Sequence, residues 1–113
     1  MGSLDDLKNP VEKDLLLRCK RTIRAMDPTA DLILFGSRAR GDAEADSDYD
    51  LLILTDGDSG LKREDSFRRS LYPLQLETGA MLSIMAINRQ IWDSTLYREM
   101  PFGRNVRRDG VVL

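Results

Sequence analysis

The amino-acid sequence predicts a small α/β domain of the α+β type, in which a short mixed sheet of about three to four strands is flanked by helices. The length of 113 residues is enough for one hydrophobic core but too small for a second. Helical periodicities alternate with short apolar runs along the chain. No internal repeat or low-complexity linker interrupts them, so residues 1–113 are expected to form one domain, with residues 1–9 as a candidate flexible segment.

The first predicted helix begins after Asn9. Asn9 can act as the N-cap, Pro10 suits the first helical position, and Glu12 is placed to complete a capping box. Pro28 is expected to end the helix. Between these limits apolar residues recur at helical spacing; they are Val11, Leu15, Cys19, Ile23 and Met26. The pattern predicts an amphipathic helix with this stripe against the core.

Two apolar runs are predicted to be neighbouring strands. Residues 31–35 contain Leu-Ile-Leu-Phe without polar alternation, which is typical of a strand buried on both faces, and they lead directly into Gly36 and Ser37. Residues 37–41 could form a short helix, and a small acidic loop follows. The second strand is expected from about residue 49 to residue 55.

The next region is predicted to hold a helix and a third strand. A turn-rich segment, residues 56–60, precedes helical spacing that continues to residue 72, where Pro73 is expected to close the helix. Residues 75–77 are predicted to be extended. The apolar run of residues 80–87 then indicates the third strand.

Two short helices are expected after the third strand. Asn88 can cap a helix that begins at Arg89. Pro101 can open a last helix, and Gly110 is placed to end it. Residues 111–113 are too few to assign.

The composition excludes several classes of partner. A formal net charge of −2 provides no general attraction to nucleic acid or to an anionic membrane, so neither is expected as a partner. Two groups of basic residues are expected to be solvated helix faces: Lys62, Arg63, Arg68 and Arg69, and Arg104, Arg107 and Arg108. Three aromatic residues are expected to pack in the core and at its edge rather than stack on bases: Trp92, Tyr97 and Phe102.

The sequence also carries no signal for a membrane or a secretory route. No apolar run approaches the roughly 18 residues that a membrane span requires. The first ten residues, MGSLDDLKNP, lack the basic and apolar regions of a signal peptide. The cytoplasm is therefore the expected location.

The residue types leave carboxylates as the source of any chemistry. The chain has no histidine and a single cysteine, Cys19, so imidazole catalysis and an internal disulfide are both excluded. Because Cys19 falls on the apolar stripe of the first helix, we expect a buried and inert thiol.

Asp48 and Asp50 lie two residues apart at the start of the second predicted strand. Successive side chains of a strand point to opposite faces, so both carboxylates should leave one face while Tyr49 points to the other. Leu52 and Leu54 follow on the face of the acids. Two like charges this close raise each other's proton affinity, a cost that a divalent cation would remove. By itself such a pair is more often a solvated strand end than a metal site.

Gly36 and Ser37 follow the carboxyl end of the first predicted strand, where α/β sheets place anionic ligands. Glycine lets the backbone approach a phosphate closely, and the serine hydroxyl can donate a hydrogen bond. Taken alone, a Gly-Ser pair after a strand is commonly just a turn. Arg38 and Arg40 lie within reach, but side chains two apart in a short helix or turn cannot both face one phosphate.

Together the turn and the acids favour a nucleotide site, because the ten residues between Ser37 and Asp48 let a turn bring them together. The stretch FGSRARGDAEADSDYDLLIL resembles the signature of the DNA polymerase beta-like nucleotidyltransferases, in particular their minimal nucleotidyltransferase (MNT) branch. The family pattern is Gly-Ser, ten residues, then Asp-any-Asp. It is met by Gly36, Ser37, Asp48 and Asp50, and the MNT branch also shares Arg40, Gly41, Ser47 and Leu51. The segment PFGRNVRRDG is similar to a weaker tail motif of small members.

The resemblance implies a role for each matching residue. Asp48 and Asp50 would hold Mg²⁺, Gly36 and Ser37 would cradle the triphosphate, and Arg40 would support it. A nucleoside monophosphate, expected to be AMP from ATP, would pass to an acceptor hydroxyl. Two Mg²⁺ ions about 3.5 to 4 Å apart could hold the attacking and leaving oxygens.

The third acid of the family is missing from the expected place. It usually lies on the next strand, where this chain has GAMLSIMAI, and counting against small members puts Met81 at that position, two residues before Ser83. A thioether is a poor ligand for magnesium, which prefers hard oxygen donors. Glu77 has the same strand parity as Met81 and is a candidate substitute.

Three functions remain open on these grounds. The first is an active transferase, and small members of the family are often paired with a separate helical HEPN protein, as antitoxins that modify a tyrosine of that toxin. The second is a catalytically degraded protein that only binds a nucleotide or masks a toxin, which Met81 favours. The third is an aminoglycoside-modifying enzyme, although the chain lacks the extra domain that such enzymes usually use to hold the drug.

Overall fold

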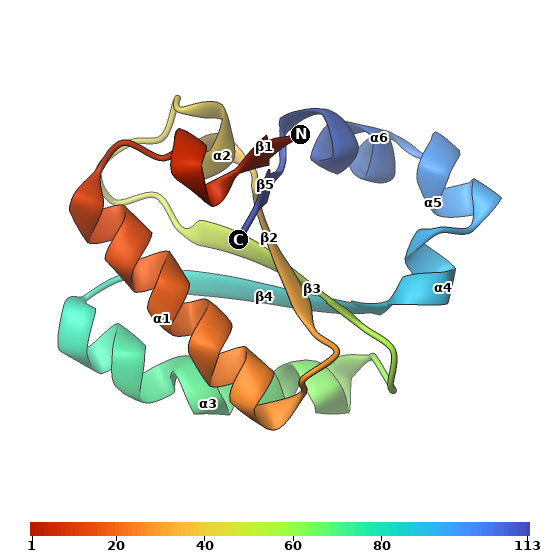
Figure 1. Cartoon of the computed structure of the whole chain (residues 1–113), viewed down its shortest axis with the longest axis horizontal. Coiled ribbons are helices and arrows are strands. Elements are labelled where there is room, and N and C mark those ends of the chain that lie inside the picture. The colour runs from red at the N-terminus through yellow and green to blue at the C-terminus, as the bar shows by residue number, and fades with distance from the viewer.

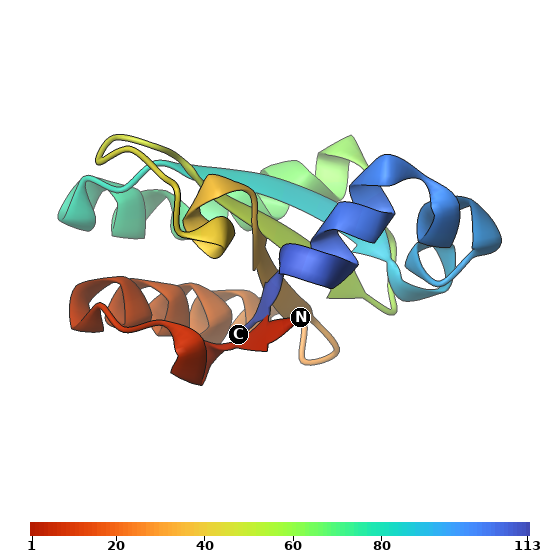
Figure 2. The ribbon, with the colours of Figure 1, turned by 90° about the horizontal axis from the view of Figure 1, so that it is seen from above.

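A computed structural model describes all residues, 1–113, and shows one sheet with helices on both of its faces (Figures 1 and 2). In chain order the elements are β1 (Gly2–Ser3), a 3₁₀ turn (Leu4–Asp6), α1 (Pro10–Met26), β2 (Asp31–Phe35), α2 (Ser37–Arg40), β3 (Tyr49–Thr55), α3 (Leu61–Thr78), β4 (Leu82–Asn88), α4 (Arg89–Trp92), α5 (Thr95–Glu99), α6 (Pro101–Asp109) and β5 (Val111–Val112). The predicted fold class is confirmed.

The sheet is mixed and has five strands in the order β1-β5-β2-β3-β4. β3 is antiparallel to β2 and parallel to β4, while β5 is antiparallel to β2 and parallel to β1. The sequence predicted three to four strands. The difference lies in β1 and β5, whose two-residue lengths leave no periodicity to detect.

The two faces of the sheet carry separate hydrophobic clusters. The larger cluster joins the sheet to α1 and α3, which Figure 1 shows side by side, and it includes Leu16, Ile53 and Phe67. The smaller cluster joins the other face to α4 and α6, with Leu52, Leu54 and Trp92 among its members. Because β3 alternates between these clusters, its odd-numbered and even-numbered residues face different helical layers.

Helix α1 begins as the sequence predicts, but its buried stripe is shifted. The Asn9 side chain accepts hydrogen bonds from the backbone N–H groups of the first turn. Val11, a predicted core residue, is 78% exposed, whereas Leu16 is fully buried. Met26 is 39% exposed. Glu12 does not complete a capping box, since its carboxylate bonds to Arg38 instead.

Helix α3 continues through Pro73 to Thr78, so the predicted end of the helix at Pro73 and the predicted extended segment at residues 75–77 are wrong. Proline removes one backbone hydrogen bond from a helix interior. Here Phe67, Leu71 and Leu74 remain buried on one side of the helix, before and after the proline. Packing therefore outweighs the local cost.

The C-terminal third largely follows the predicted starts and stops. The Asn88 side chain accepts a bond from the N–H of Gln90, Pro101 opens α6, and Gly110 follows its end. Trp92 is buried and lies near the rings of Tyr97 and Phe102, as expected for packing residues.

Two basic residues are not the solvated side chains that the sequence predicted. Arg63 binds Asp27 at 3.1 Å and stacks on the Phe67 ring. Arg107 lies over the Trp92 ring and donates to the Trp92 carbonyl at 2.6 Å. These two guanidinium groups therefore pack neighbouring helices together.

None of the helices has the length and apolar character that crossing a bilayer requires.

Candidate functional site

The acidic pair lies at the start of β3. Asp50 is the second residue of the strand and is half-buried, whereas Asp48 is exposed in the last part of the preceding loop. Asp50 pairs with Phe35 on β2 and with Ser83 on β4. As the alternation predicted, Leu52 belongs to the cluster beneath α4 and α6. Asp50 therefore stands on that face, at the edge of the cluster.

Gly36 touches the carboxylate of Asp50 directly. Gly36 has a φ of +74°, and a Cβ atom built on it would overlap Asp50 Oδ2 and lie 3.3 Å from Asp50 Cγ. The turn between β2 and α2 and the acidic end of β3 are thus in contact, although they are distant in sequence. No side chain larger than glycine fits between them.

Ser37 begins the short helix α2. The Gly36 carbonyl accepts hydrogen bonds from the N–H groups of Ala39 and Arg40, each at 3.1 Å. The first N–H groups of a helix have no partner within the helix itself. The Ser37 N–H therefore belongs to the part of the turn that can donate to a ligand beside Asp50.

Asp50 is in an environment that disfavours its negative charge. Partial burial raises the pKa of Asp50, the negative charge of Asp48 raises it further, and the positive charge of Arg40 opposes both. The site is therefore short of positive charge. A divalent cation between the two carboxylates would offset this cost.

The two arginines of α2 have different surroundings. Arg40 is exposed, contacts Asp42 at 3.3 Å and acts electrostatically on Asp50. Arg38 is turned to the other side of the loop, where it binds Glu12 and the carbonyls of Ala45 and Ser47. Sequence reasoning gave Arg38 no role, and its long-range partner Glu12 leaves no local signal.

No third carboxylate joins the pair. Met81 is 60% exposed and immediately precedes β4, and the residue that pairs with Asp50 on β4 is Ser83. The candidate substitute Glu77 is ruled out, because it lies in α3 rather than on a strand and forms an ion pair with Arg18 of α1. Groups of three or more potential metal-ligating side chains are absent.

A small cavity of about 150 Å³ adjoins the turn. Its wall combines two aromatic rings with polar groups from α2 and α6; the lining residues are Phe35, Gly36, Arg40, Phe102, Asn105, Val106 and Asp109. Larger cavities lie behind the loop, about 270 Å³, and at the start of α3, about 490 Å³, and neither includes Gly36 or Arg40. Asp48 and Asp50 line none of these cavities, but the small one includes Gly36, which contacts Asp50, and it is therefore the relevant one.

The residues present fit a magnesium ion. Asp48 and Asp50 offer two hard oxygen donors, and Gly36 has no side chain that would crowd the Asp50 carboxylate. Magnesium in proteins usually keeps several waters and is bound through one or two carboxylates together with phosphate oxygens. Two carboxylates and a bound polyphosphate would complete such a set.

The chain matches the model of a known protein family. A family model described as a nucleotidyltransferase domain matches residues 16–95, which is more than two thirds of the chain and includes every predicted site residue. A comparison with curated proteins finds no match.

Proposed function

Because the chain belongs to the nucleotidyltransferase domain family, we propose that it binds a magnesium nucleoside triphosphate and transfers the nucleoside monophosphate to a hydroxyl acceptor. The observation that supports this most strongly is the contact between the Gly36 backbone and the Asp50 carboxylate. It places a backbone turn of the kind that binds phosphate next to a carboxylate that can bind magnesium.

Each site residue has a distinct task in this proposal. Asp48 and Asp50 hold Mg²⁺, the Gly36–Ser37 turn donates to the triphosphate, and Arg40 offsets its charge. Magnesium supplies charge stabilisation for the phosphates. The acceptor oxygen forms a bond to the α-phosphorus, the bond to the bridging oxygen breaks, pyrophosphate leaves, and the hydroxyl proton passes to solvent. The cavity between α2 and α6 adjoins the Gly36 turn and is lined by Arg40 and by the rings of Phe35 and Phe102.

The finer proposal is that the chain is of the MNT type and transfers AMP to a separate protein. Its support is the resemblance of residues 35–54 to the MNT signature. The acceptor would then be a hydroxyl, such as that of a tyrosine, on a helical HEPN-type partner, with the chain acting as the antitoxin. We propose the cytoplasm as the location.

A second candidate is a protein that binds the nucleotide without transferring it. The observation that favours it is the absence of a third carboxylate near Asp50. Ser83 is the residue of β4 that pairs with Asp50, Met81 precedes that strand, and Glu77 of α3 forms an ion pair with Arg18. Two acids can hold one magnesium with its nucleotide. Activation of the acceptor hydroxyl is the step for which a third acid is expected.

A transfer assay separates the two candidates. The protein is incubated with Mg²⁺, each of the four α-labelled nucleoside triphosphates, and a candidate helical HEPN-type protein, and the label on that protein is measured. Transfer is expected from ATP, and it should be absent from the Asp50→Asn variant. If the natural chain transfers nothing while a Met81→Asp or Ser83→Asp variant does, the non-catalytic candidate is correct.

A further inference from the structure

The Arg38 side chain forms hydrogen bonds with the backbone of the loop between α2 and β3, residues 41–48. The loop carries Asp48 and has neither a helix nor a strand of its own. The Arg38 guanidinium donates to the Ser47 carbonyl from Nε at 3.2 Å and from one terminal nitrogen at 2.9 Å. The same terminal nitrogen donates to the Ala45 carbonyl at 3.0 Å. These bonds fix the loop immediately before Asp48.

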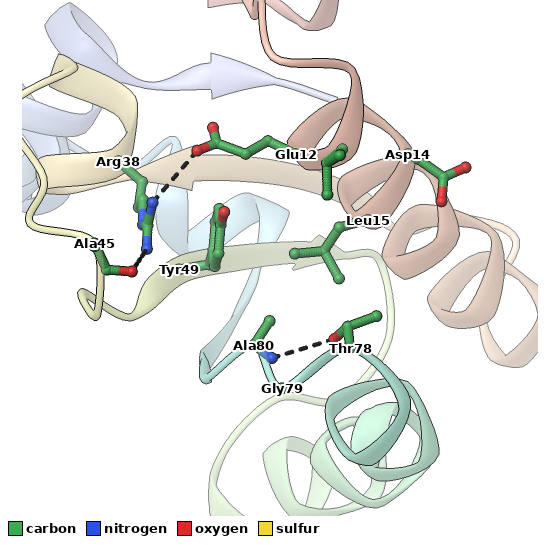
Figure 3. A pocket seen from close by; sticks show the side chains of 10 residues that line it. Glu12, Asp14, Leu15, Arg38, Ala45, Tyr49, Thr78, Gly79 and Ala80 are labelled. Atoms are coloured by element: carbon green, nitrogen blue, oxygen red, sulfur yellow. Dashed lines mark hydrogen bonds and ion pairs between the residues drawn. The ribbon is translucent and has the colours of Figure 1, made fainter.

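Arg38 is itself held in place from two directions. Its other terminal nitrogen binds Glu12 of α1 at 3.3 Å, and its guanidinium lies over the Tyr49 ring, 4.4 Å from the centroid (Figure 3). The Arg38 side chain is only 14% exposed and that of Glu12 is 24% exposed. A guanidinium presents several donors in a rigid plane and can also stack on an aromatic ring. Arg38 uses both of these properties, and we call the group that it joins, which is Glu12, Tyr49 and the carbonyls of Ala45 and Ser47, the Arg38 cluster.

The two chain neighbours of Asp48 both belong to this cluster. Ser47 is bound through its carbonyl, and Tyr49 is buried beneath the guanidinium with its backbone N–H donating to the Met81 carbonyl at 2.9 Å. Asp48 itself is exposed. Its position relative to Asp50 thus depends on contacts made behind the loop.

We propose that Arg38 is a positioning residue, which holds the loop so that the Asp48 carboxylate stands beside Asp50 and both can bind one Mg²⁺. The inference rests on the proposed function, and it assigns a task to an arginine that does not face the phosphates. Residues that orient metal ligands typically change metal affinity by about 10-fold to 100-fold when they are replaced. Arg38 acts on the metal through the backbone of Ser47.

The test is the Mg²⁺ requirement of ATP binding. Lysine keeps the charge of Arg38 but cannot reach Ala45, Ser47 and Glu12 together or stack in the same plane. In the Arg38→Lys variant, the Mg²⁺ concentration for half-maximal ATP binding should rise about 10-fold or more. The ATP affinity at saturating Mg²⁺ should change much less. A purely structural role would instead lower thermal stability and leave the Mg²⁺ requirement unchanged.

Two further variants make the result decisive. Arg18→Lys is the matched control, because Arg18 of α1 also forms an ion pair with an acid of another helix, Glu77 of α3, but does not contact the loop. The Mg²⁺ requirement of this variant should equal that of the wild type. Glu12→Ala removes the anchor and leaves the carbonyl bonds, so it should raise the requirement, and it carries the test if Arg38→Lys does not fold.

The failure of this inference differs from the failure of the proposed function. A folded Arg38→Lys or Glu12→Ala protein with the wild-type Mg²⁺ requirement overturns the role of Arg38, provided that the Asp48→Asn, Asp50→Asn double variant has lost its dependence on Mg²⁺. If the double variant keeps the wild-type dependence, the magnesium site itself is wrong.

Discussion

At the scale of single residues, the site depends on a glycine that has no room for a side chain. Gly36 combines a φ of +74° and a ψ of −157°, a region that is essentially restricted to glycine, with direct contact to the Asp50 carboxylate. The sequence could predict the turn, because a glycine after a buried strand is a local signal. The alternation of side chains along a strand could also predict which face of the sheet carries Asp50, because Leu52, two residues later, lies in the cluster on that face.

Replacing Gly36 by alanine should both destabilise the fold and remove nucleotide binding. The backbone strain costs about 1–3 kcal/mol, and the new methyl group would displace the Asp50 carboxylate. Gly41 is the matched control, since its φ of +82° is also positive but a Cβ atom there has no atom within 4 Å. Denaturant unfolding and ATP titration measure both effects. Equal loss of ATP binding in Gly36→Ala and Gly41→Ala would show that the contact with Asp50 is unimportant.

For Arg38 and Glu77, the sequence does not reveal the partners of the side chain. Arg38 was placed in the same short segment as Arg40, yet its partners include Glu12 from a different element. Glu77 matched the parity of a strand but lies in a helix, paired with Arg18. Side-chain partners that come from distant segments leave no periodicity, so sequence reasoning could name these residues but could not place them.

At the scale of elements, the helices were predicted where local signals agree with packing. Asn9 and Asn88 cap the helices that the sequence assigned to them. Pro73 was misleading because a proline is a strong local signal for a helix end, whereas the buried residues Leu71 and Leu74 on either side of it keep α3 continuous. Local rules give way where burial of apolar side chains extends past them.

Asp27 connects α1, β3 and α3 through one buried carboxylate. It accepts bonds from Thr29 Oγ1 at 2.6 Å, from the Thr55 hydroxyl and from Arg63 at 3.1 Å. Burial by itself would raise the pKa of Asp27, but the hydrogen bonds from Thr29, Thr55 and Arg63 outweigh it and lower the pKa to about 2. In the unfolded chain an aspartate has a pKa of about 3.9.

This difference predicts a loss of stability in acid. A carboxylate whose pKa is lower in the folded state stabilises the fold above about pH 4, and the contribution disappears as the pH falls through about 4 to 2. Asp27→Asn should be less stable at neutral pH by about 1–3 kcal/mol, and its deficit relative to the wild type should shrink over this interval. Denaturant unfolding between pH 2 and pH 7 measures it. A deficit that is constant with pH would contradict the role of the Asp27 charge.

At the scale of the whole molecule, the sheet brings the site together from three strands. Phe35 and Ser83 flank Asp50 on β2 and β4, and the turn after β2 closes over it. The order of β2, β3 and β4 in the sheet was not predicted in detail, and the pairing of Gly2 with Val111 had no sequence signal, because pairs between the two ends of a chain have no local pattern. What the sequence predicted was that the ten residues between Ser37 and Asp48 allow the turn and the acids to lie close together.

If the turn and the acidic pair together bind a magnesium nucleotide, the affinity for ATP must depend on Mg²⁺ through Asp48 and Asp50. Titration of ATP with and without Mg²⁺, on the wild type and on the Asp48→Asn, Asp50→Asn double variant, measures this dependence. The variant should stay folded, because burial and the charge of Asp48 raise the pKa of Asp50, and the ionised Asp50 carboxylate is therefore a cost to the fold at neutral pH. Mg²⁺ should strengthen ATP binding about 10-fold or more in the wild type, at least ~1.4 kcal/mol, and have no effect in the variant. Equal ATP affinity in all four titrations would show that Asp48 and Asp50 do not bind a magnesium nucleotide.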